Sequence, residues 1–403
     1  MIIKIKSRLQ QVWETRLNGE NLFFFSYTIS LFISFIVNTT FMQYIPVRYL
    51  NWLNYILMLI LILKIVVFDK FKVWQLGFIG IILLLAIYSW RKSQITLLMV
   101  MITYILAAKD IDFTKIVKRY FDVNFVMLVG VSIYSLLGII RNLTFERNGI
   151  ARQALGIDYP TDLAAYILYL ALAYCFLKYN HLKWYHYLGL LFLSFILNLI
   201  TNARLDVYAL ILTIIIFIIA KRAQQPQNRF SRITVSSFWG LSLILPYIYF
   251  LLTYYYNPTN EVFIKLNDLL SGRLLFGHVA LSKYGITMLG QHVVEQGWGG
   301  VQGLHVFQTA QFKYFFIDST YIRLLVIYGS VLAIFIITSL IIISVRETLR
   351  HNYVFPAIIL IITISSLIDQ HLIEITFNPF LLALLANTYT KSAEEKINNE
   401  RAI

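Results

Sequence analysis

Charged residues are scarce in this sequence: Asp, Glu, Lys and Arg make up 13% of its 403 residues, against about 25% in a soluble domain. So few charges cannot cover a water-exposed surface of this size, and 59% of the residues are hydrophobic. The composition therefore excludes an ordinary soluble protein. Cysteine is almost absent too, and the single Cys175 can form no intramolecular disulfide.

Two kinds of sequence pattern are also missing. No Gly-x-x-x-x-Gly-Lys-Ser/Thr phosphate loop is present, and the glycine-rich stretch 297–303 lacks the lysine of such a loop, so it predicts a turn. We therefore do not expect the chain itself to hydrolyse ATP. No internal repeat of about 20 to 50 residues is visible, and the two halves differ, which argues against a carrier built from paired repeats.

Long apolar runs recur from residue 22 to residue 389. A helix needs about 20 apolar residues to cross about 30 Å of hydrocarbon, and continuous runs exclude a transmembrane barrel, whose strands alternate. The pattern predicts an all-α, polytopic integral membrane protein with one membrane domain over residues 1–403. We place about twelve spans, or ten to twelve because the fourth and eleventh are short, at 22–45, 49–68, 73–89, 94–108, 121–140, 161–177, 184–200, 205–220, 233–255, 321–345, 354–368 and 371–389. The first is interpreted as a retained signal-anchor because basic residues precede it and no cleavage site follows.

The 34 basic residues predict the orientation of these spans. With the N-terminus inside, most Lys and Arg residues fall in cytoplasmic segments, and few fall in the short external loops, as the positive-inside rule requires. Both termini are then cytoplasmic, and a long external segment, 256–320, precedes the third-last span. The net charge of +14 then reflects topology and anionic inner-leaflet lipid, and no nucleic-acid partner is expected.

Among the basic residues that depart from this bias by lying on the external side, three arginines stand out. Arg152 precedes the span 161–177, Arg204 lies in the tight turn before 205–220, and Arg273 lies in the long external segment. A guanidinium matches phosphate or carboxylate with two donors and stays charged when partly desolvated. Three such groups converging on one external cavity would suit a diphosphate. Alternatively, each reaches lipid headgroups or pairs with a nearby acid, such as Asp158, Asp162 or Asp206.

Asp318 lies where the long external segment enters the span 321–345, in the sequence Asp-Ser-Thr-Tyr321. A carboxylate at the mouth of an aqueous cavity can accept a proton from an attacking hydroxyl. Asp318, Ser319 and Thr320 are also good helix-capping types. Catalysis and capping both remain open, and one does not exclude the other.

His371, Glu374 and Asn378 recur at helical spacing in the span 371–389. A carboxylate about one turn into the membrane is costly unless it is paired or hydrated, so we interpret Glu374 as part of an ion pair, with Arg323 as a candidate partner. His278, His292 and His305 lack the close spacing of metal ligands, and no metal site is expected.

Several short motifs resemble the Wzy-type polysaccharide polymerases, membrane enzymes that are similar to O-antigen ligases. They are Arg152-x-x-x-Gly156 followed by Tyr-Pro-Thr161, Thr-Asn-Ala-Arg204, Ser-Gly-Arg273 followed by Tyr284-Gly-Ile and Gly290, and Asp318-Ser-x-Tyr321 followed by Gly329. The layout is similar as well, with many spans, internal termini and one large external loop late in the chain.

The resemblance implies a metal-independent glycosyltransferase without cofactors, on the outer leaflet of the bacterial cytoplasmic membrane. Such an enzyme passes a glycan from undecaprenyl diphosphate to the sugar hydroxyl of the next lipid-linked repeat unit and releases undecaprenyl diphosphate. By the resemblance, Arg152, Arg204 and Arg273 hold the diphosphate. Asp318 stands where the ligases have a histidine proposed to act on the acceptor, and Tyr321, His371 and Glu374 are further candidates for substrate binding. The implied partners are the lipid-linked donor and acceptor, the bilayer and a co-polymerase that regulates chain length.

Three other classes of membrane protein remain open. A lipid-linked oligosaccharide flippase or another secondary transporter would also have internal termini and cationic residues, but no long external loop would be expected. An O-antigen-ligase-type enzyme would differ only in its acceptor, and the last alternative is a membrane protein without catalytic activity.

Overall fold

The computed structural model describes residues 18–147, 149–309 and 313–389. These residues are mostly helical. Six helices are long and apolar enough to cross a membrane, or seven if α10 and α11, which meet at a 42° bend, form one span. This count is consistent with an all-α membrane protein. The helices and strands are α2 (Gly19–Val37), α3 (Val47–Val67), α4 (Val73–Ser93), α5 (Leu97–Ala107), α6 (Phe113–Leu136), β1 (Thr144–Arg147), β2 (Ile150–Gln153), α7 (Pro160–Leu177), α8 (Trp184–Thr201), α9 (Arg204–Ala223), α10 (Arg229–Ser236), α11 (Phe238–Tyr254), α12 (Glu261–Leu269), α13 (Arg273–Tyr284), α14 (Gly300–Thr309), α15 (Thr320–Arg323), α16 (Ser330–Leu349) and α17 (Val354–Ser365).

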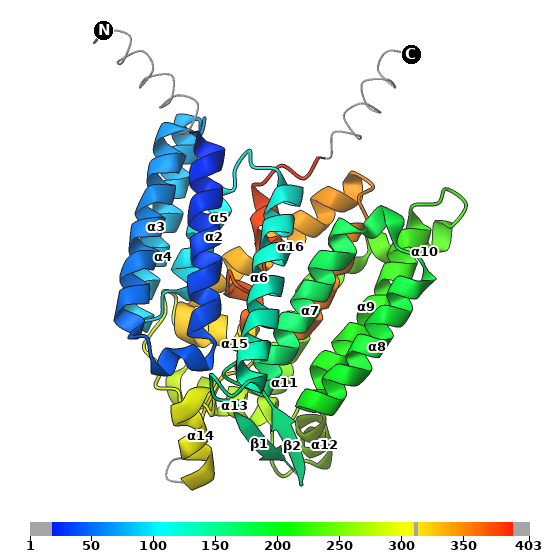
Figure 1. The fold of residues 1–403 in the computed structure, drawn as a ribbon. Coiled ribbons are helices and arrows are strands. Elements are labelled where there is room, and N and C mark those ends of the chain that lie inside the picture. Colours follow the sequence, from blue (N-terminus) through cyan, green and yellow to red (C-terminus); the bar gives the residue numbers. More distant parts are fainter. Residues whose placement is uncertain (1–17, 148, 310–312, 390–403) are drawn as a thin grey trace.

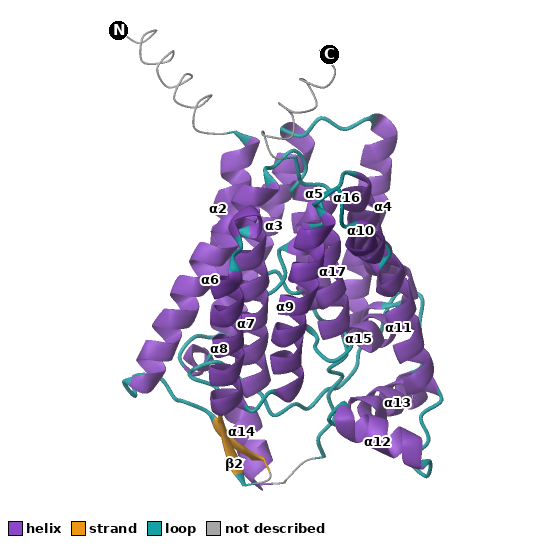
Figure 2. Cartoon of the chain, turned by 90° about the vertical axis from the view of Figure 1, so that its right-hand side faces the viewer, coloured by secondary structure: helices purple, strands orange, loops and turns teal. Residues whose placement is uncertain are grey.

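The long helices form a bundle whose two ends differ (Figures 1 and 2). The β1–β2 hairpin and the helices α12, α13 and α14 gather at one end, which we call the hairpin end. At the opposite end, the backbone N–H of Phe113 at the start of α6 donates to Asn387, near the last described residue (2.9 Å). The segments predicted to be external, around the hairpin and in 256–320, therefore lie together at one end of the bundle.

The predicted span 371–389 is not a helix, so this prediction was wrong. It contains two 3-10 turns, His371–Ile373 and Phe380–Leu384, joined by a further turn in which the Asn378 N–H donates to the Glu374 carbonyl (2.9 Å). Pro379 disfavours helix at the residue before it, and the Asn378 side chain instead donates to the Leu372 carbonyl (2.8 Å) and accepts from the Phe380 N–H (3.0 Å). Every residue from 371 to 383 is buried. The segment is apolar because it lies inside the protein.

The predicted span 321–345 is interrupted. A short helix, α15, leads into a π-helical turn (Leu324–Tyr328), and α16 begins only after Gly329. The loop at Gly290 crosses this break closely: the Gln291 N–H donates to the Ile327 carbonyl (3.0 Å), and the Ser330 N–H donates to the Thr287 carbonyl (2.9 Å).

Alanine at Gly290 or Gly329 is expected to destabilise the fold. Both glycines have positive φ, 89° and 96°, and a Cβ at either would lie 2.5 Å from a backbone atom of the other segment. A non-glycine residue in such a conformation costs about 1–3 kcal/mol, and the clash adds to that cost. The thermal midpoint of each purified variant should fall. Gly77→Ala on α4, where a Cβ meets nothing within 4 Å, is the matched control, and equal midpoints for all three variants would contradict the prediction.

Candidate active site at the hairpin end

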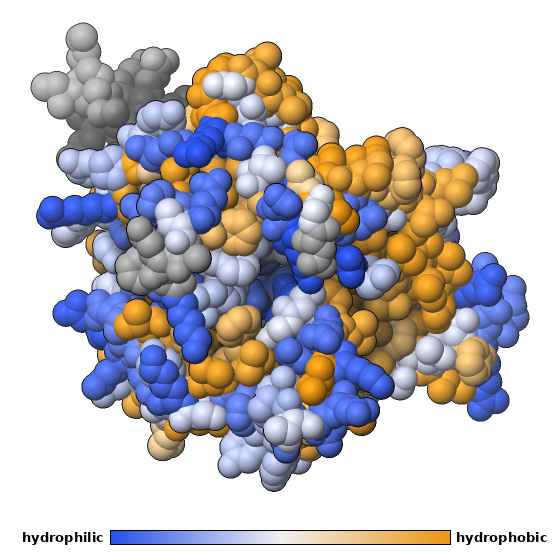
Figure 3. All heavy atoms as spheres, turned by 90° about the horizontal axis from the view of Figure 1, so that it is seen from below, coloured by the Kyte–Doolittle hydropathy of each residue, from blue (hydrophilic) through white to orange (hydrophobic). Residues whose placement is uncertain are grey.

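Two adjoining cavities open at the hairpin end, with volumes of about 400 and 300 Å³. Figure 3, which views this end of the molecule, shows hydrophilic residues around a hollow near the centre of the face. We call the first cavity the arginine lobe, because Arg147, Arg152 and Arg273 line it, and the second the acid lobe, because Asp158, Asp162, Asp369 and His371 line it. Their common wall consists of Tyr159, Thr161, Trp298, Tyr314 and Asp318.

Arg152 is the most constrained cation of the arginine lobe. It lies on β2 opposite Phe145 of β1, and only 4% of it is exposed. Its Nε donates to the carbonyl of Thr201, the last residue of α8 (2.7 Å), while its Nη2 is buried without a hydrogen-bond partner among the described residues. A buried unsatisfied donor of a charged group costs more than the 1–3 kcal/mol typical of a neutral one, so this nitrogen is suited to a bound anion.

Arg147 and Arg273 add charge to the same lobe. Burial, followed by the charges of Arg152, Arg204 and Arg273, lowers the pKa of Arg147 from its ordinary value. Burial alone would also lower the pKa of Arg273, but nearby carboxylates, Asp318 first, outweigh it and raise this pKa. Arg273 begins α13, donates from Nε to the Ile368 carbonyl and lies 3.8 Å from Asp369. Three guanidinium groups thus line one lobe, together with the carboxylates of Glu146 and Asp318.

Arg204 does not line the arginine lobe, although all three predicted arginines were expected to converge on one cavity. It begins α9, is exposed, and lines a separate groove between α8 and α9. Its charge still acts on Arg147, so it lies close to the rim of the lobe. The alternative role predicted for these three arginines was an ion pair with a nearby acid. Within the described residues, Arg273 makes such a pair, with Asp369, whereas Arg152 and Arg204 do not.

Asp318 lies in the wall shared by the two lobes. Burial raises the pKa of its carboxyl to about 6, and Arg273 partly opposes this rise. The helix that follows, α15, has Ser319 as its N-cap and no side-chain capping hydrogen bond. Thr320 donates instead to the Asp369 carbonyl (2.6 Å). Helix capping therefore does not explain Asp318, and its carboxylate accepts no hydrogen bond from the described part of the chain.

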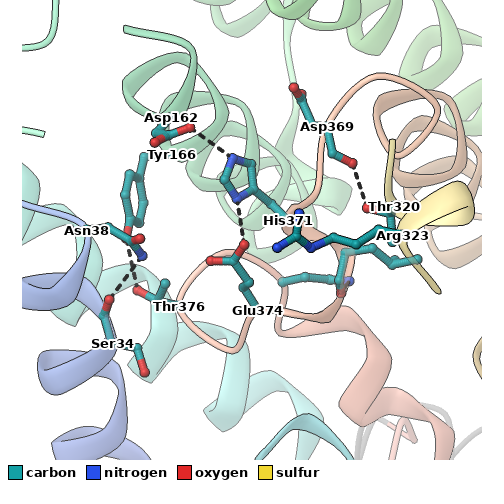
Figure 4. Close-up of polar contacts among 12 residues, drawn as sticks. Ser34, Asn38, Asp162, Tyr166, Thr320, Arg323, Asp369, His371, Glu374 and Thr376 are labelled. Carbon is teal, nitrogen blue, oxygen red and sulfur yellow. Dashed lines mark hydrogen bonds and ion pairs between the residues drawn. The ribbon is translucent and has the colours of Figure 1, made fainter. Parts of the chain in front are cut away.

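A carboxylate–histidine–carboxylate arrangement forms one side of the acid lobe (Figure 4). His371 Nε2 lies 3.4 Å from Asp162 Oδ1 on α7, and His371 Nδ1 lies 3.1 Å from Glu374 Oε1. The imidazole also stacks on the ring of Phe377, with centroids 3.8 Å apart. These contacts fix the ring plane, so one edge of His371 faces the cavity-lining Asp162 while the buried Glu374 supports the other.

The partner predicted for Glu374 was wrong. Arg323 ends the short helix α15, where it pairs with Glu295 in the loop after α13 (2.7 Å) and donates to the Ile317 carbonyl (3.2 Å). Glu374 pairs with His371, and their proximity comes from a 3-10 turn and not from one face of a helix.

Tyr321 does not reach either lobe. It is 2% exposed, and its hydroxyl donates to the Thr363 carbonyl of α17 (3.2 Å). Its position supports packing between α15 and α17, so the structure does not bring this candidate to a substrate site.

Some cavity residues were not predicted from the sequence, namely Arg147, Trp298 and Tyr314. A signal for Arg147 exists: the Asn-Gly pair at 148–149 favours a tight hairpin, which would bring the residues before it alongside Arg152. For Trp298 and Tyr314 the sequence carries no comparable signal, because α14 lies between them in the chain although their rings are in contact (centroids 4.2 Å apart).

Within the described residues, no group of three or more His, Cys, Asp or Glu side chains could hold a metal ion. No protein-family model matches the chain, and no curated protein or solved structure matches it either.

Proposed function

We propose that the protein is a glycosyltransferase that polymerises lipid-linked repeat units. It joins undecaprenyl-diphosphate-linked oligosaccharides on the outer leaflet of the bacterial cytoplasmic membrane and releases undecaprenyl diphosphate. One observation carries the proposal: a cavity holds three arginines, one of them with a buried unpartnered N–H, directly beside a carboxylate with a raised pKa. The resemblance to Wzy-type polymerases agrees with this chemistry.

In the proposed reaction the arginine lobe holds the diphosphate of the donor. The acceptor hydroxyl attacks the anomeric carbon of the donor sugar and forms the new C–O bond. The bond from that carbon to the diphosphate oxygen breaks, and the diphosphate leaves with the electron pair. Fixed cations aimed at the leaving oxygens stabilise the charge that develops there, which is the role of Arg152 and Arg273.

The hydroxyl proton passes to Asp318. A general base works best when its pKa lies near the operating pH, and the pKa of Asp318 is raised to about 6. Because Asp318 belongs to both lobes, it can reach an acceptor in the acid lobe while the donor diphosphate lies in the arginine lobe. Asp162, positioned by His371, then binds sugar hydroxyls, and the rings of Trp298, Tyr159 and Tyr314 offer stacking surfaces.

A ligase that moves finished glycan to another acceptor would use the same arginine lobe, and an associated co-polymerase would control chain length only in a polymerase.

Both termini are cytoplasmic in the proposed topology, which places the hairpin end outside the cell. This is also where a lipid-linked substrate would arrive after transport across the membrane.

Purified protein reconstituted with undecaprenyl-diphosphate-linked repeat units is expected to produce a ladder of longer glycans without ATP and in the presence of EDTA. Gel separation of a labelled glycan measures the ladder. Movement of the lipid-linked unit across the bilayer without a ladder would favour a flippase, and transfer of a single glycan to a different acceptor would favour a ligase.

A further inference from the structure

We propose that the two lipid tails of donor and acceptor bind in two separate grooves on opposite sides of α8. This inference rests on the proposed function, because it assigns a prenyl chain to each groove. It adds that both lipid-linked substrates are held at the same time, each with its diphosphate near an arginine at the hairpin end.

The first groove lies between α8 and α9 and has a volume of about 360 Å³. We call it the α8–α9 groove. Its walls are largely apolar, with Phe195 of α8 and Ile211 of α9 among them, and Arg204 closes its end at the hairpin side. Arg204 is exposed and makes no ion pair within the described chain. A largely apolar groove with an exposed cation at its end matches the first part of a prenyl chain that carries a diphosphate.

The second groove lies between α6, α7 and α8 and is formed by two cavities of about 250 and 530 Å³. We call it the α6–α8 groove. The two cavities share Leu128, Ile167 and Leu193, so they join into one path. The path runs along α8 from His186 to Ile200, roughly 21 Å at 1.5 Å per residue. This length covers much of the hydrocarbon core of a bilayer, which is about 30 Å thick.

The two grooves occupy different faces of α8. Leu191, Phe195 and Asn198 face the first, whereas Gly189, Leu193 and Ile200 face the second. At 3.6 residues per turn these two stripes are centred roughly 150° apart. The body of α8 therefore separates the two grooves along their whole length.

Both grooves end at the same group of arginines. The α6–α8 groove ends at Leu155 and Ile200, beside the strand that carries Arg152, and Arg152 Nε bonds to Thr201 at the end of α8. The α8–α9 groove ends at Arg204, three residues further along the chain. The end of α8 thus has a cation on each side, which fits two anionic headgroups better than one.

A polymerase needs two prenyl-linked substrates, since donor and acceptor both carry a lipid diphosphate. A ligase needs one. Two grooves that end beside Arg152 and Arg204 would hold both tails in the membrane and leave both headgroups at the hairpin end.

The test blocks each groove with tryptophan and measures the binding of labelled undecaprenyl diphosphate to the protein in phosphatidylcholine nanodiscs. Asn198→Trp fills the α8–α9 groove from an exposed position, and Gly189→Trp fills the α6–α8 groove, where a Cβ meets nothing within 4 Å. Gly77→Trp on α4 is the matched control, because it is equally open but lines neither groove. We expect two equivalents of ligand bound to the wild type and to the control, and one equivalent bound to each groove variant.

One equivalent bound to the wild type, or unchanged binding in both groove variants, would overturn the inference. Displacement by excess phosphatidylglycerol would overturn it too, because the occupant would then be ordinary bilayer lipid. The ladder assay separates this outcome from failure of the proposed function. If the wild type forms the ladder but binds only one equivalent of ligand, the inference of two grooves is refuted and the proposed function is not. If the wild type neither forms the ladder nor binds the ligand, both proposals are refuted.

Discussion

Replacement of Arg152 with lysine is expected to lower glycan polymerisation about 100- to 1,000-fold, the usual effect of removing one donor aimed at developing negative charge. Lysine keeps the positive charge and can still donate to the Thr201 carbonyl, which Arg152 Nε now contacts at 2.7 Å. It cannot replace the buried Nη2, which has no partner within the described chain. Arginine and lysine are not equivalent where a phosphate is bound by two donors. The measurement is the initial rate of ladder formation at equal protein level.

Arg141→Lys provides the matched control for this variant. Arg141 is an exposed arginine near the same hairpin and lines neither lobe. If Arg152→Lys were as active as Arg141→Lys, Arg152 would be a structural residue that supports the end of α8, and the diphosphate would be bound elsewhere. A lower thermal midpoint together with normal activity would lead to the same conclusion.

Hydropathy predicted most helices of the bundle because lipid and protein interior both select apolar side chains. The same property explains the failure at 371–389. Leu372, Phe377 and Leu381 are apolar and fully buried. The segment that contains them is therefore as hydrophobic as a membrane span, although its backbone around Pro379 is not helical. In a single sequence, an apolar segment that is buried inside the protein has the same hydropathy as one that is buried in lipid. Only a clear break in the helical periodicity would distinguish the two.

The candidate site could be predicted in part for a different reason. Arg152, Arg273 and Asp318 were selected from their external position together with the resemblance to the polymerase motifs, and the structure brings all three to the arginine lobe. For Arg204, Tyr321 and Arg323, the predicted orientation of the side chain was wrong. Each lies within a few residues of a helix start, where a shift of one position moves the side chain by about 100° around the axis. Sequence spacing defines the neighbourhood of such residues but not the cavity they face.

The second large effect is expected at Asp318. Asp318→Asn should lower the rate of polymerisation about 100- to 10,000-fold if the carboxylate is the general base. Asparagine has nearly the same shape, and α15 has no side-chain capping hydrogen bond to lose, so the fold should be retained. The rate of ladder formation and the thermal midpoint together separate a catalytic defect from a folding defect.

The pH profile gives this prediction a signature that a structural role would not produce. Burial raises the pKa of Asp318 to about 6, and only the ionised form can accept the proton. The wild-type rate should therefore rise about tenfold per pH unit below 6 and level off above about 7, because the ionised fraction then approaches one. Asp158 in the acid lobe also has a raised pKa, of about 7, so Asp158→Asn is the matched control. We expect Asp158→Asn to keep the rise near pH 6, while the residual activity of Asp318→Asn should lose it. An unchanged profile in Asp318→Asn would assign the base to another group, and Asp162, which lines the acid lobe beside His371, would be the next to replace.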